Sequence, residues 1–301
     1  MIDDAQIREI VERNRFVWED QLTLDILHKW LNNFTGDAAE LEQEQKVALN
    51  LMNNFMLYSE KEIKYLCKAA LSIIKREIIR KKVARGIAVS AENIKQEITD
   101  NYRFSYVGEA GESGAHLLYQ FRQENKLLNE HCKEPSKFLL EPCNDALLPD
   151  ANLIFIDDFL GTGRTACKFW DSTIVQISAK YPRIKMNFLA LVTTTRAIQE
   201  IKDYTGLNVL SPQVLDCHYK VFSEDSMVFP SNEDRETAKR ICELYGCKLV
   251  RRAHALGYEN SQALLGFHHN IPDNTLPVIW SEKVQTNGKK WSPLFKRYSK
   301  F

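Results

Sequence analysis

The segment "FIDDFLGTGRT", residues 155–165, places two adjacent acids before a glycine-rich loop near the middle of this 301-residue chain. An apolar run at residues 152–157, "NLIFID", leads into the segment and is typical of a buried parallel strand. Asp157 and Asp158, called the acid pair below, are therefore expected at the carboxyl end of that strand. Open α/β sheets bind their ligands at this edge, so the acid pair is a candidate ligand site.

The loop after the acid pair has the composition of an anion site. Gly161 and Gly163 permit a tight turn, while the side chains of Thr162, Arg164 and Thr165 offer two hydroxyl groups and a cation. The next helix is expected to begin here, so its free N–H groups and the positive end of its dipole would face the loop. Carboxylates instead suit sugar hydroxyls or a hard cation such as Mg²⁺. A sugar phosphate meets both demands, with its diol on the acids and its phosphate in the loop.

The sequence after about residue 100 alternates between strand-like and helix-like segments. This alternation predicts an α/β fold with a mostly parallel sheet flanked by helices. The predicted strands are residues 103–108, 152–157, 185–194 and 207–211. The predicted helices are residues 114–128, 164–181, 196–206 and 231–246.

A helical region is predicted to precede this α/β domain. We expect two domains, an N-terminal helical region over residues 1–100 and the α/β domain over residues 101–301. Apolar residues recur at helical spacing within residues 5–34 and 41–58, and a shorter helix is predicted at residues 90–102. The expected architecture is therefore an α/β domain with an all-helical N-terminal extension.

The clearest helix of that extension lies between Ser59 and Gly86. Ser59 and Glu62 have the spacing of a capping box, and Gly86 is a typical C-terminal stop. Its second half carries a cluster of basic residues: Lys75, Arg76, Arg80, Lys81, Lys82 and Arg85. Such a cluster either contacts the phosphates of a nucleic acid or an acidic partner, or forms the solvated face of a helix, and the solvated face is the more common explanation.

Composition limits the classes of protein to consider. Lysine plus arginine and aspartate plus glutamate each total 40, and this balance argues against bulk binding of polyanions. The seven cysteines include no CxxC pair, which argues against a disulfide framework or a structural zinc ribbon. The N-terminal residues lack the apolar core of a signal peptide, and no apolar run approaches the roughly 20 residues of a membrane span. These features predict a cytoplasmic protein with reduced thiols.

Two further segments are candidate parts of a site. The turn after residue 107 carries Glu109 and Glu112, which could hold a metal, act as general acid or base, or favour the dipole of the following helix. The segment at residues 266–282 is predicted to form two strands joined by a tight turn at residues 272–274. Its polar side chains could line a pocket or bond to their own loop, and they are His268, His269 and Asn270.

The acid pair and its loop resemble the phosphoribosyl pyrophosphate (PRPP) binding motif of type I phosphoribosyltransferases. That motif is an apolar strand, two acids, three variable residues and Thr-Gly-x-Thr, and residues 157–165 match it without a gap. Together with residues 107–125 and 268–277, and with the helical segment at residues 48–71, the chain is similar to a narrower group. This group is the phosphoribosyltransferase-like domains of bacterial conflict and anti-phage operons, some of which lie beside retron reverse transcriptases.

The resemblance assigns expected roles to individual residues. Asp157 and Asp158 would hold the ribose hydroxyls, with Mg²⁺ as cofactor, and the 5′-phosphate would lie on Gly161, Thr162, Gly163, Arg164 and Thr165. The earlier turn would bind the pyrophosphate through Gly108, Gly111, Ser113 and Gly114. Some purine-salvage members carry an aspartate that acts on the base at the position of Gly161, so this chain lacks that group.

The function implied by the resemblance is that of a toxin-like effector in anti-phage defence. It would be an enzyme of the glycosyltransferase class with PRPP or a related ribose phosphate as ligand, and Asp157, Asp158, Glu109 and Glu112 would be its catalytic residues. An operon-encoded protein such as a reverse transcriptase complex would be its partner. Two alternatives stay open: a non-catalytic module that senses a nucleotide or ribose phosphate and assembles with a partner, and a nucleotide glycosidic hydrolase.

Overall fold

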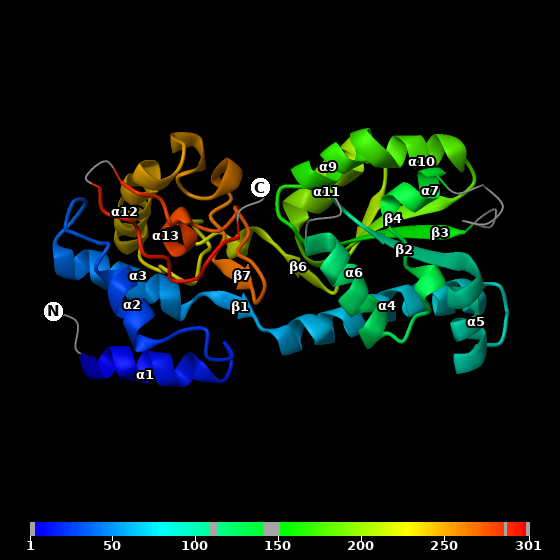
Figure 1. Ribbon diagram of the computed structural model, residues 1–301, viewed down its shortest axis with the longest axis horizontal. Coiled ribbons are helices and arrows are strands. Elements are labelled where there is room, and N and C mark those ends of the chain that lie inside the picture. The colour runs from blue at the N-terminus through cyan, green and yellow to red at the C-terminus, as the bar shows by residue number, and fades with distance from the viewer. Residues whose placement is uncertain (1–3, 109–112, 141–150, 286–287, 299–301) are drawn as a thin grey trace. The chain divides into compact units, whose positions relative to one another are not determined.

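The computed structural model describes residues 4–108, 113–140, 151–285 and 288–298 (Figure 1). The chain forms two compact units. Unit 1 combines both ends of the chain, Met1–Glu62 and Cys217–Phe301, and unit 2 is the continuous middle, Ile63–Asp216. The boundaries of these units do not coincide with the expected division at residue 100.

A five-stranded sheet forms the centre of unit 2, and every neighbouring pair of its strands is parallel. The strands are β2 (Tyr102–Tyr106), β3 (Asn152–Leu160), β4 (Lys185–Thr194), β5 (Asn208–Leu210) and β6 (Gln213–Leu215). They follow the order β2-β3-β4-β5, and β6 pairs with the last residues of β4. In β3 the run Leu153–Ile156 is almost wholly buried, as expected for a strand covered on both faces.

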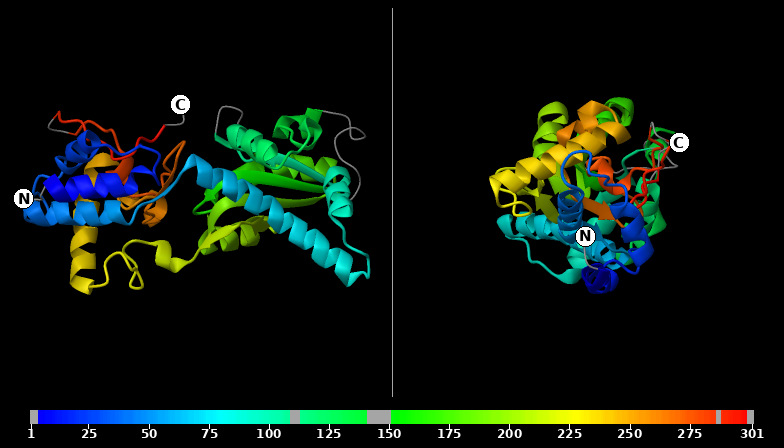
Figure 2. Two further views of the ribbon diagram at one scale, coloured as in Figure 1. Left: turned by 90° about the horizontal axis from the view of Figure 1, so that it is seen from below. Right: turned by 90° about the vertical axis from the view of Figure 1, so that its left-hand side faces the viewer.

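Helices cover both faces of this sheet (Figures 1 and 2). On one face, Phe155 and Phe188 share a hydrophobic cluster with Ile177 and Ile201 of the helices that follow β3 and β4. On the other face, Phe104 of β2 lies 5.1 Å from Phe121 of α6, measured between ring centroids. The helices of unit 2 are α5 (Ala91–Asn101), α6 (Ser113–Glu124), α7 (Pro135–Leu140), α9 (Arg164–Phe169), α10 (Val175–Lys180) and α11 (Thr195–Thr205), together with most of α4 (Glu60–Ala84).

Unit 1 joins sequence from both ends of the chain in one core. Strand β1 (Met56–Tyr58) pairs in parallel with β7 (Leu265–Phe267), and the buried indole of Trp30 donates a hydrogen bond to the carbonyl oxygen of Val278. One hydrophobic cluster holds residues from both chain ends. The helices of this unit are α1 (Asp4–Arg15), α2 (Leu24–Leu31), α3 (Leu41–Asn53), α12 (Asn232–Leu249) and α13 (Pro277–Trp280).

The structure confirms the predicted fold class, a mostly parallel α/β sheet flanked by helices with a helical N-terminal region. It also confirms the capping box, because Glu62 N–H donates to Ser59 Oγ and Ser59 N–H donates to the Glu62 carboxylate. Gly86 takes the left-handed conformation of a helix stop, with φ +69°. None of the described helices combines the length and the apolar composition that a membrane span requires.

Several predicted elements need correction. The helical segment 5–34 is interrupted after α1, where Glu19 and Asp20 have positive φ, and the segment 41–58 ends in the strand β1. Residues 276–282 were expected to form a strand, but Pro277 begins the short helix α13, a position that suits its fixed φ. The tight turn before it is present, since Thr275 N–H donates to Pro272 O. Strand β6 was not predicted at all.

Candidate functional site

The candidate site lies at the carboxyl edge of the unit 2 sheet. Strand β2 ends beside the middle of β3, where Tyr106 is paired with Ile156 and Val107 N–H donates to Ile156 O at 3.0 Å. The chain leaves β2 at this level, directly next to the acid pair. Parallel pairing thus brings the end of β2 and the loop after β3 to the same edge of the sheet.

The acid pair lies inside β3 and not at its end, which corrects the predicted strand boundary. The strand runs on to Leu160 because Phe159 and Leu160 are paired with Val192 and Thr193 of β4. Both carboxylates are half-buried. The Asp157 carboxylate accepts a hydrogen bond from the backbone N–H of Asp158 at 2.9 Å, which fixes its orientation against the strand.

The Gly161–Thr165 loop is a tight turn packed on α11. Gly163 has φ +83° and precedes the first residue of α9, a conformation that glycine adopts without strain. A Cβ atom at Gly163 would lie 3.2 Å from Ile201 Cγ1 and 3.3 Å from the Ala197 carbonyl oxygen. Thr162 is buried and Thr165 is exposed. The loop therefore needs glycine both for its backbone angle and for its close approach to the helix.

Arg164, the cation expected for the phosphate, is engaged in an ion pair. Its Nη1 lies 3.4 Å from Glu200 Oε1 on α11, and the side chain remains 51% exposed. Since an exposed pair of this kind is weak, a phosphate in the loop can compete with Glu200 for the guanidinium.

Two buried threonines of β4 support the loop, and the sequence reasoning missed them. Thr193 Oγ1 donates to Leu160 O at 3.1 Å, and Thr194 Oγ1 donates to Gly161 O at 2.6 Å. Thr194 also caps α11 by accepting a hydrogen bond from Ala197 N–H. The signal was present as three consecutive threonines at the end of a predicted strand, where a helix begins.

The turn after β2 is described only in part. Gly108 has φ +103°, and α6 begins at Ser113. A Cβ atom at Gly114 would lie 2.6 Å from the Val107 carbonyl oxygen, so the first turn of α6 rests directly against the end of β2. The other residues predicted for this turn lie outside the described residues: Glu109, Gly111 and Glu112.

The predicted pocket residues His268 and Asn270 belong to unit 1. His268 is part of the lining of a 580 Å³ cavity together with Gln21, whose amide lies 2.6 Å from His268 Nδ1. Asn270 has a local role, because its Oδ1 accepts hydrogen bonds from the backbone N–H groups of Ile271 and Tyr298. His268 thus lines a cavity, and Asn270 bonds to the backbone of its own segment and of the C-terminal segment.

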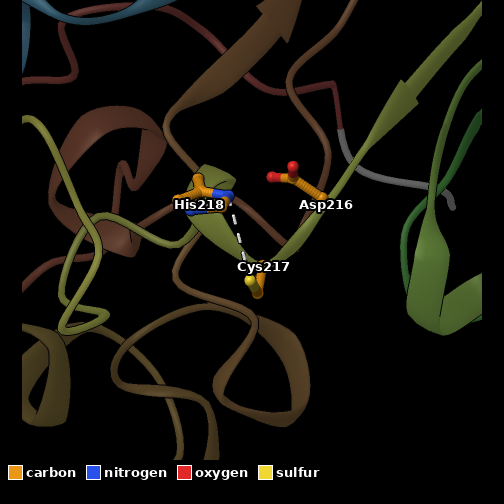
Figure 3. Close-up of side chains that lie close together, drawn as sticks. All are labelled: Asp216, Cys217 and His218. Atoms are coloured by element: carbon orange, nitrogen blue, oxygen red, sulfur yellow. Dashed lines mark hydrogen bonds between the residues drawn. The ribbon is translucent and has the colours of Figure 1, made fainter.

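One group of three potential metal-ligating side chains comes together within the described part of the chain (Figure 3). Asp216, Cys217 and His218 follow one another in sequence, and their potential ligand atoms lie within 4.8 Å of one another. All three are exposed, and a 3₁₀ turn begins at Cys217. Because a turn alone brings neighbouring side chains this close, the group is not assigned as a metal site.

Comparison with known proteins identifies a family. The sequence profile of the PRTase-CE family matches residues 27–297, which is most of the chain and includes β2, β3, β4 and the acid pair. No curated protein matches the chain. The chain therefore belongs to the PRTase-CE family and carries a phosphoribosyltransferase-type domain.

Proposed function

We propose that this protein is a transferase-like enzyme that binds PRPP, or a related ribose phosphate, at the carboxyl edge of the unit 2 sheet. The observation that carries the proposal is the arrangement of the acid pair in β3, directly before a glycine turn that opens a helix. Half-buried carboxylates suit a vicinal diol, and a turn with backbone N–H groups suits a phosphate. The membership of the PRTase-CE family supports the same assignment.

Three parts of such a ligand would correspond to three neighbouring segments of the edge. The ribose hydroxyls would lie on Asp157 and Asp158, the 5′-phosphate on the loop that ends at Thr165, and the pyrophosphate on the turn between β2 and α6. The register of β2 and β3 supports this division, since Val107 N–H donates to the carbonyl oxygen of Ile156, the residue directly before Asp157. The ligand would therefore lie across the ends of two adjacent strands.

A magnesium ion fits the donor set. Mg²⁺ is commonly held by one or two carboxylates together with phosphate oxygens and water. The acid pair offers carboxylates, and the remaining ligands would come from the pyrophosphate. When bound, the ion would supply neutralisation of the charge that develops on the leaving group. The residues of the chain would hold the ribose and orient the phosphate.

The test is titration calorimetry of PRPP with Mg²⁺ into the wild type and into Asp158→Asn. We expect binding in the wild type and a loss of tenfold or more in Asp158→Asn, because the amide removes a charged acceptor for the ribose hydroxyls. Asp203→Asn is the matched control, since Asp203 is an exposed acid on α11 in the same unit. Equal affinity in all three proteins would remove the acid pair from the proposal.

A second candidate function is a sensor without catalysis. The observation in its favour is Gly161, which is buried and carries no side chain at the position where some related enzymes have an aspartate. A sensor would bind the same ligand, so binding alone cannot separate the two functions. Product analysis with radiolabelled PRPP, nucleotides and NAD separates them. Pyrophosphate released together with a phosphoribosylated acceptor indicates transfer, whereas ribose 5-phosphate from PRPP or a free base from a nucleotide indicates hydrolysis. Unchanged ligand in the presence of binding supports the sensor.

We further propose a role as an effector of anti-phage defence with an operon-encoded partner. The resemblance of residues 107–125, 155–166 and 268–277 to domains of bacterial conflict operons supports it. The test is a plaque assay on cells that carry the native operon, with Asp157→Asn/Asp158→Asn as the variant. Protection lost in the variant supports an effector that needs its site, and protection that is absent in the wild type as well contradicts the role.

A further inference from the structure

A second cavity of unit 2 lies away from the acid pair. Its volume is 630 Å³, within the range of roughly 300–1,000 Å³ that is typical of small-molecule sites. It is enclosed by α4, α5 and the segment that follows α6, and none of its lining residues belongs to the acid pair or its loop. The lining residues on which the argument rests are Leu71, Lys75, Lys95, Ile98, Lys126 and His131. This cavity is called the α4–α5 pocket below.

The α4–α5 pocket lies toward the amino end of β2, whereas the acid pair lies near the carboxyl end of its neighbour. Ile98 and Thr99 precede Tyr102, the first residue of β2, and they line the pocket. The strand then runs to Tyr106, beside the acid pair. At about 3.3 Å per residue, β2 separates the two sites by more than roughly 10 Å.

The charge of the lining points to an anion. Three lysines line the pocket, on α4, on α5 and after α6, and its described lining contains no carboxylate. All three lysines are exposed, so they stand at the rim. The wall between them is aliphatic and includes Leu71 and Ile98, which are almost wholly buried. The pocket thus combines an apolar interior with a basic rim.

His131 adds a polar group to this interior. The side chain is only 2% exposed, and neither ring nitrogen makes a hydrogen bond of normal geometry among the described residues, although the Thr99 backbone lies close enough to interact with the ring. The nearest carboxylate oxygen, Oε1 of Glu130, is 3.8 Å from Nε2, beyond hydrogen-bonding distance. A buried polar group whose hydrogen bonds are incompletely satisfied is costly, so a ligand that offers His131 better geometry gains free energy there.

The protonation state of His131 defines what that ligand must offer. Burial, together with the nearby Arg103 guanidinium, lowers the pKa of His131 below its ordinary value. The ring is therefore neutral at neutral pH and presents one donor and one acceptor. A fatty acid would also suit a basic rim and an apolar interior, but its hydrocarbon end has no polar atom to bond to the imidazole. A heterocyclic base has both a donor and an acceptor for the imidazole nitrogens.

We propose that the α4–α5 pocket binds a nucleoside monophosphate, with its base between the aliphatic wall and His131 and its phosphate at Lys75, Lys95 and Lys126. The site would be separate from the ribose phosphate site and independent of its function.

The experiment is titration calorimetry with AMP, GMP, CMP and UMP. It uses the Asp157→Asn/Asp158→Asn protein, because the acid pair would itself hold a ribose phosphate. We expect at least one of the four nucleotides to bind this protein with one site per chain. Adenosine and inorganic phosphate are expected to bind more weakly than the nucleotide, since each makes only part of the contacts. Absence of binding by all four nucleotides would overturn the proposal.

Charge reversal at the rim locates the binding. Lys95→Glu/Lys126→Glu in the same background is expected to weaken binding tenfold or more, because the phosphate then faces like charges. The matched control is Lys81→Glu, an exposed lysine of α4 that does not line the pocket, and its affinity is expected to be unchanged. Equal affinity of the rim variant and the control would show that the nucleotide binds elsewhere and would contradict the proposal.

A second variant tests the interior. His131→Leu keeps a side chain of similar volume but removes the donor and the acceptor, and we expect it to reduce the affinity for the nucleotide more than for inorganic phosphate. Circular dichroism melting checks that the variant is folded. If it does not fold, the rim variants alone decide the outcome, since their exposed positions do not bear on folding.

Discussion

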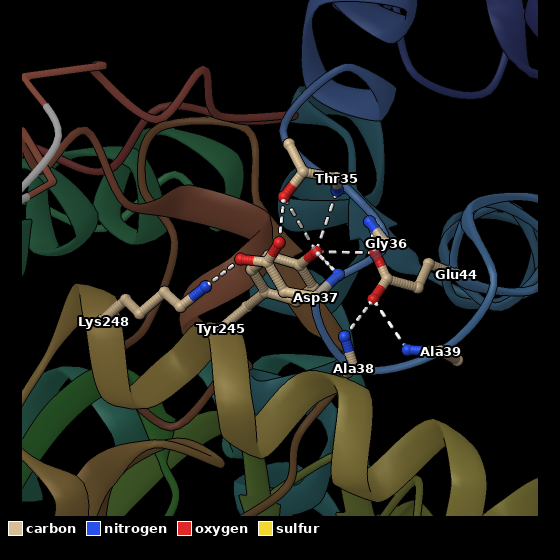
Figure 4. A network of polar contacts seen from close by, with 8 residues as sticks. All are labelled: Thr35, Gly36, Asp37, Ala38, Ala39, Glu44, Tyr245 and Lys248. Atoms are coloured by element: carbon tan, nitrogen blue, oxygen red, sulfur yellow. Dashed lines mark hydrogen bonds and ion pairs between the residues drawn. The ribbon is translucent and has the colours of Figure 1, made fainter.

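A buried carboxylate fixes the loop at residues 35–39 in unit 1 (Figure 4). Glu44 is 0% exposed and accepts hydrogen bonds from the backbone N–H groups of Gly36, Ala38 and Ala39 at 2.7–3.1 Å. The hydroxyl group of Tyr245 on α12 donates a fourth hydrogen bond at 2.6 Å. A charged group is tolerated here because these four donors are directed at it. The network joins the loop before α3 to a helix 200 residues later in the chain.

Replacing this carboxylate tests its importance. Glu44→Gln turns one acceptor oxygen into a donor that faces other donors, so we expect a loss of roughly 3 kcal/mol in the free energy of unfolding. Glu42→Gln, an exposed position on the same helix, is the control and is expected to cost less than about 0.5 kcal/mol. Urea unfolding followed by circular dichroism measures both. Equal stability of the two variants would show that the loop does not depend on Glu44.

The ion pair between Asp37 and Lys248 predicts a dependence on pH. Hydrogen bonds from Lys248 and Thr35 hold the pKa of Asp37 below its usual value. A carboxyl group of this kind stabilises the folded state above its unfolded-state pKa, near 4, and the contribution is lost as the pH falls through the lower folded-state pKa. Asp37→Asn should therefore cost about 0.5 kcal/mol at neutral pH, a small value because both side chains are partly exposed. The difference from the wild type in urea unfolding should shrink below about pH 4, and a constant difference would contradict the assignment.

At the scale of the elements, the first turn of α6 packs closely against the end of β2 near the candidate site. Alanine normally stabilises a helix relative to glycine by about 1 kcal/mol. At Gly114 we expect the opposite, a loss of roughly 2 kcal/mol in Gly114→Ala, because its Cβ would lie 2.6 Å from the Val107 carbonyl oxygen. His116→Ala, an exposed position of the same helix, serves as the control. Thermal melting that shows Gly114→Ala to be as stable as the wild type would mean that α6 can move away from β2 at no cost.

Local sequence signals predicted most helices and strands. They failed where contacts between residues far apart in sequence determine whether an element forms. The capping box of Ser59 and Glu62 and the stop at Gly86 placed both ends of α4, because each signal acts within one turn. The predicted helix over residues 164–181 forms, but a π-helical turn at Trp170–Ile174 divides it into α9 and α10. Strand β6 carries no run long enough to be detected, and its existence depends on pairing with the end of β4.

At the scale of the whole molecule, the apolar residues of segment 1–62 are buried against the C-terminal part of the chain. Trp18 and Trp30 are buried in a cluster that includes residues from 221 to 295. A chain that ends at Asp216 should leave these indoles in water, so we expect a red shift of tryptophan fluorescence, measured with Trp170→Phe as background. The control is a chain that ends at Tyr298. Retention of the native emission in the shorter chain would contradict a shared core.

More of the candidate site than of the fold of unit 1 could be predicted from the sequence. Asp157, Asp158, Gly161 and Gly163 follow one another in a single run, so their order alone indicated a strand, an acid pair and a turn. The exact end of the strand could not be predicted, because Phe159 and Leu160 join the sheet only through pairing with β4. The supporting hydroxyl groups of Thr193 and Thr194 also come from that strand.

The sequence by itself determined the α/β class, the position of the acid pair next to a glycine turn, and the ends of the capped helices. These features depend on residue types within a few positions of one another, where backbone sterics and burial act locally. Only the tertiary structure decided that residues 1–62 and 217–301 share one core, and that a cavity lined by lysines and the buried His131 lies beyond the amino end of β2. Both depend on contacts between residues far apart in sequence, and no local pattern specifies such contacts.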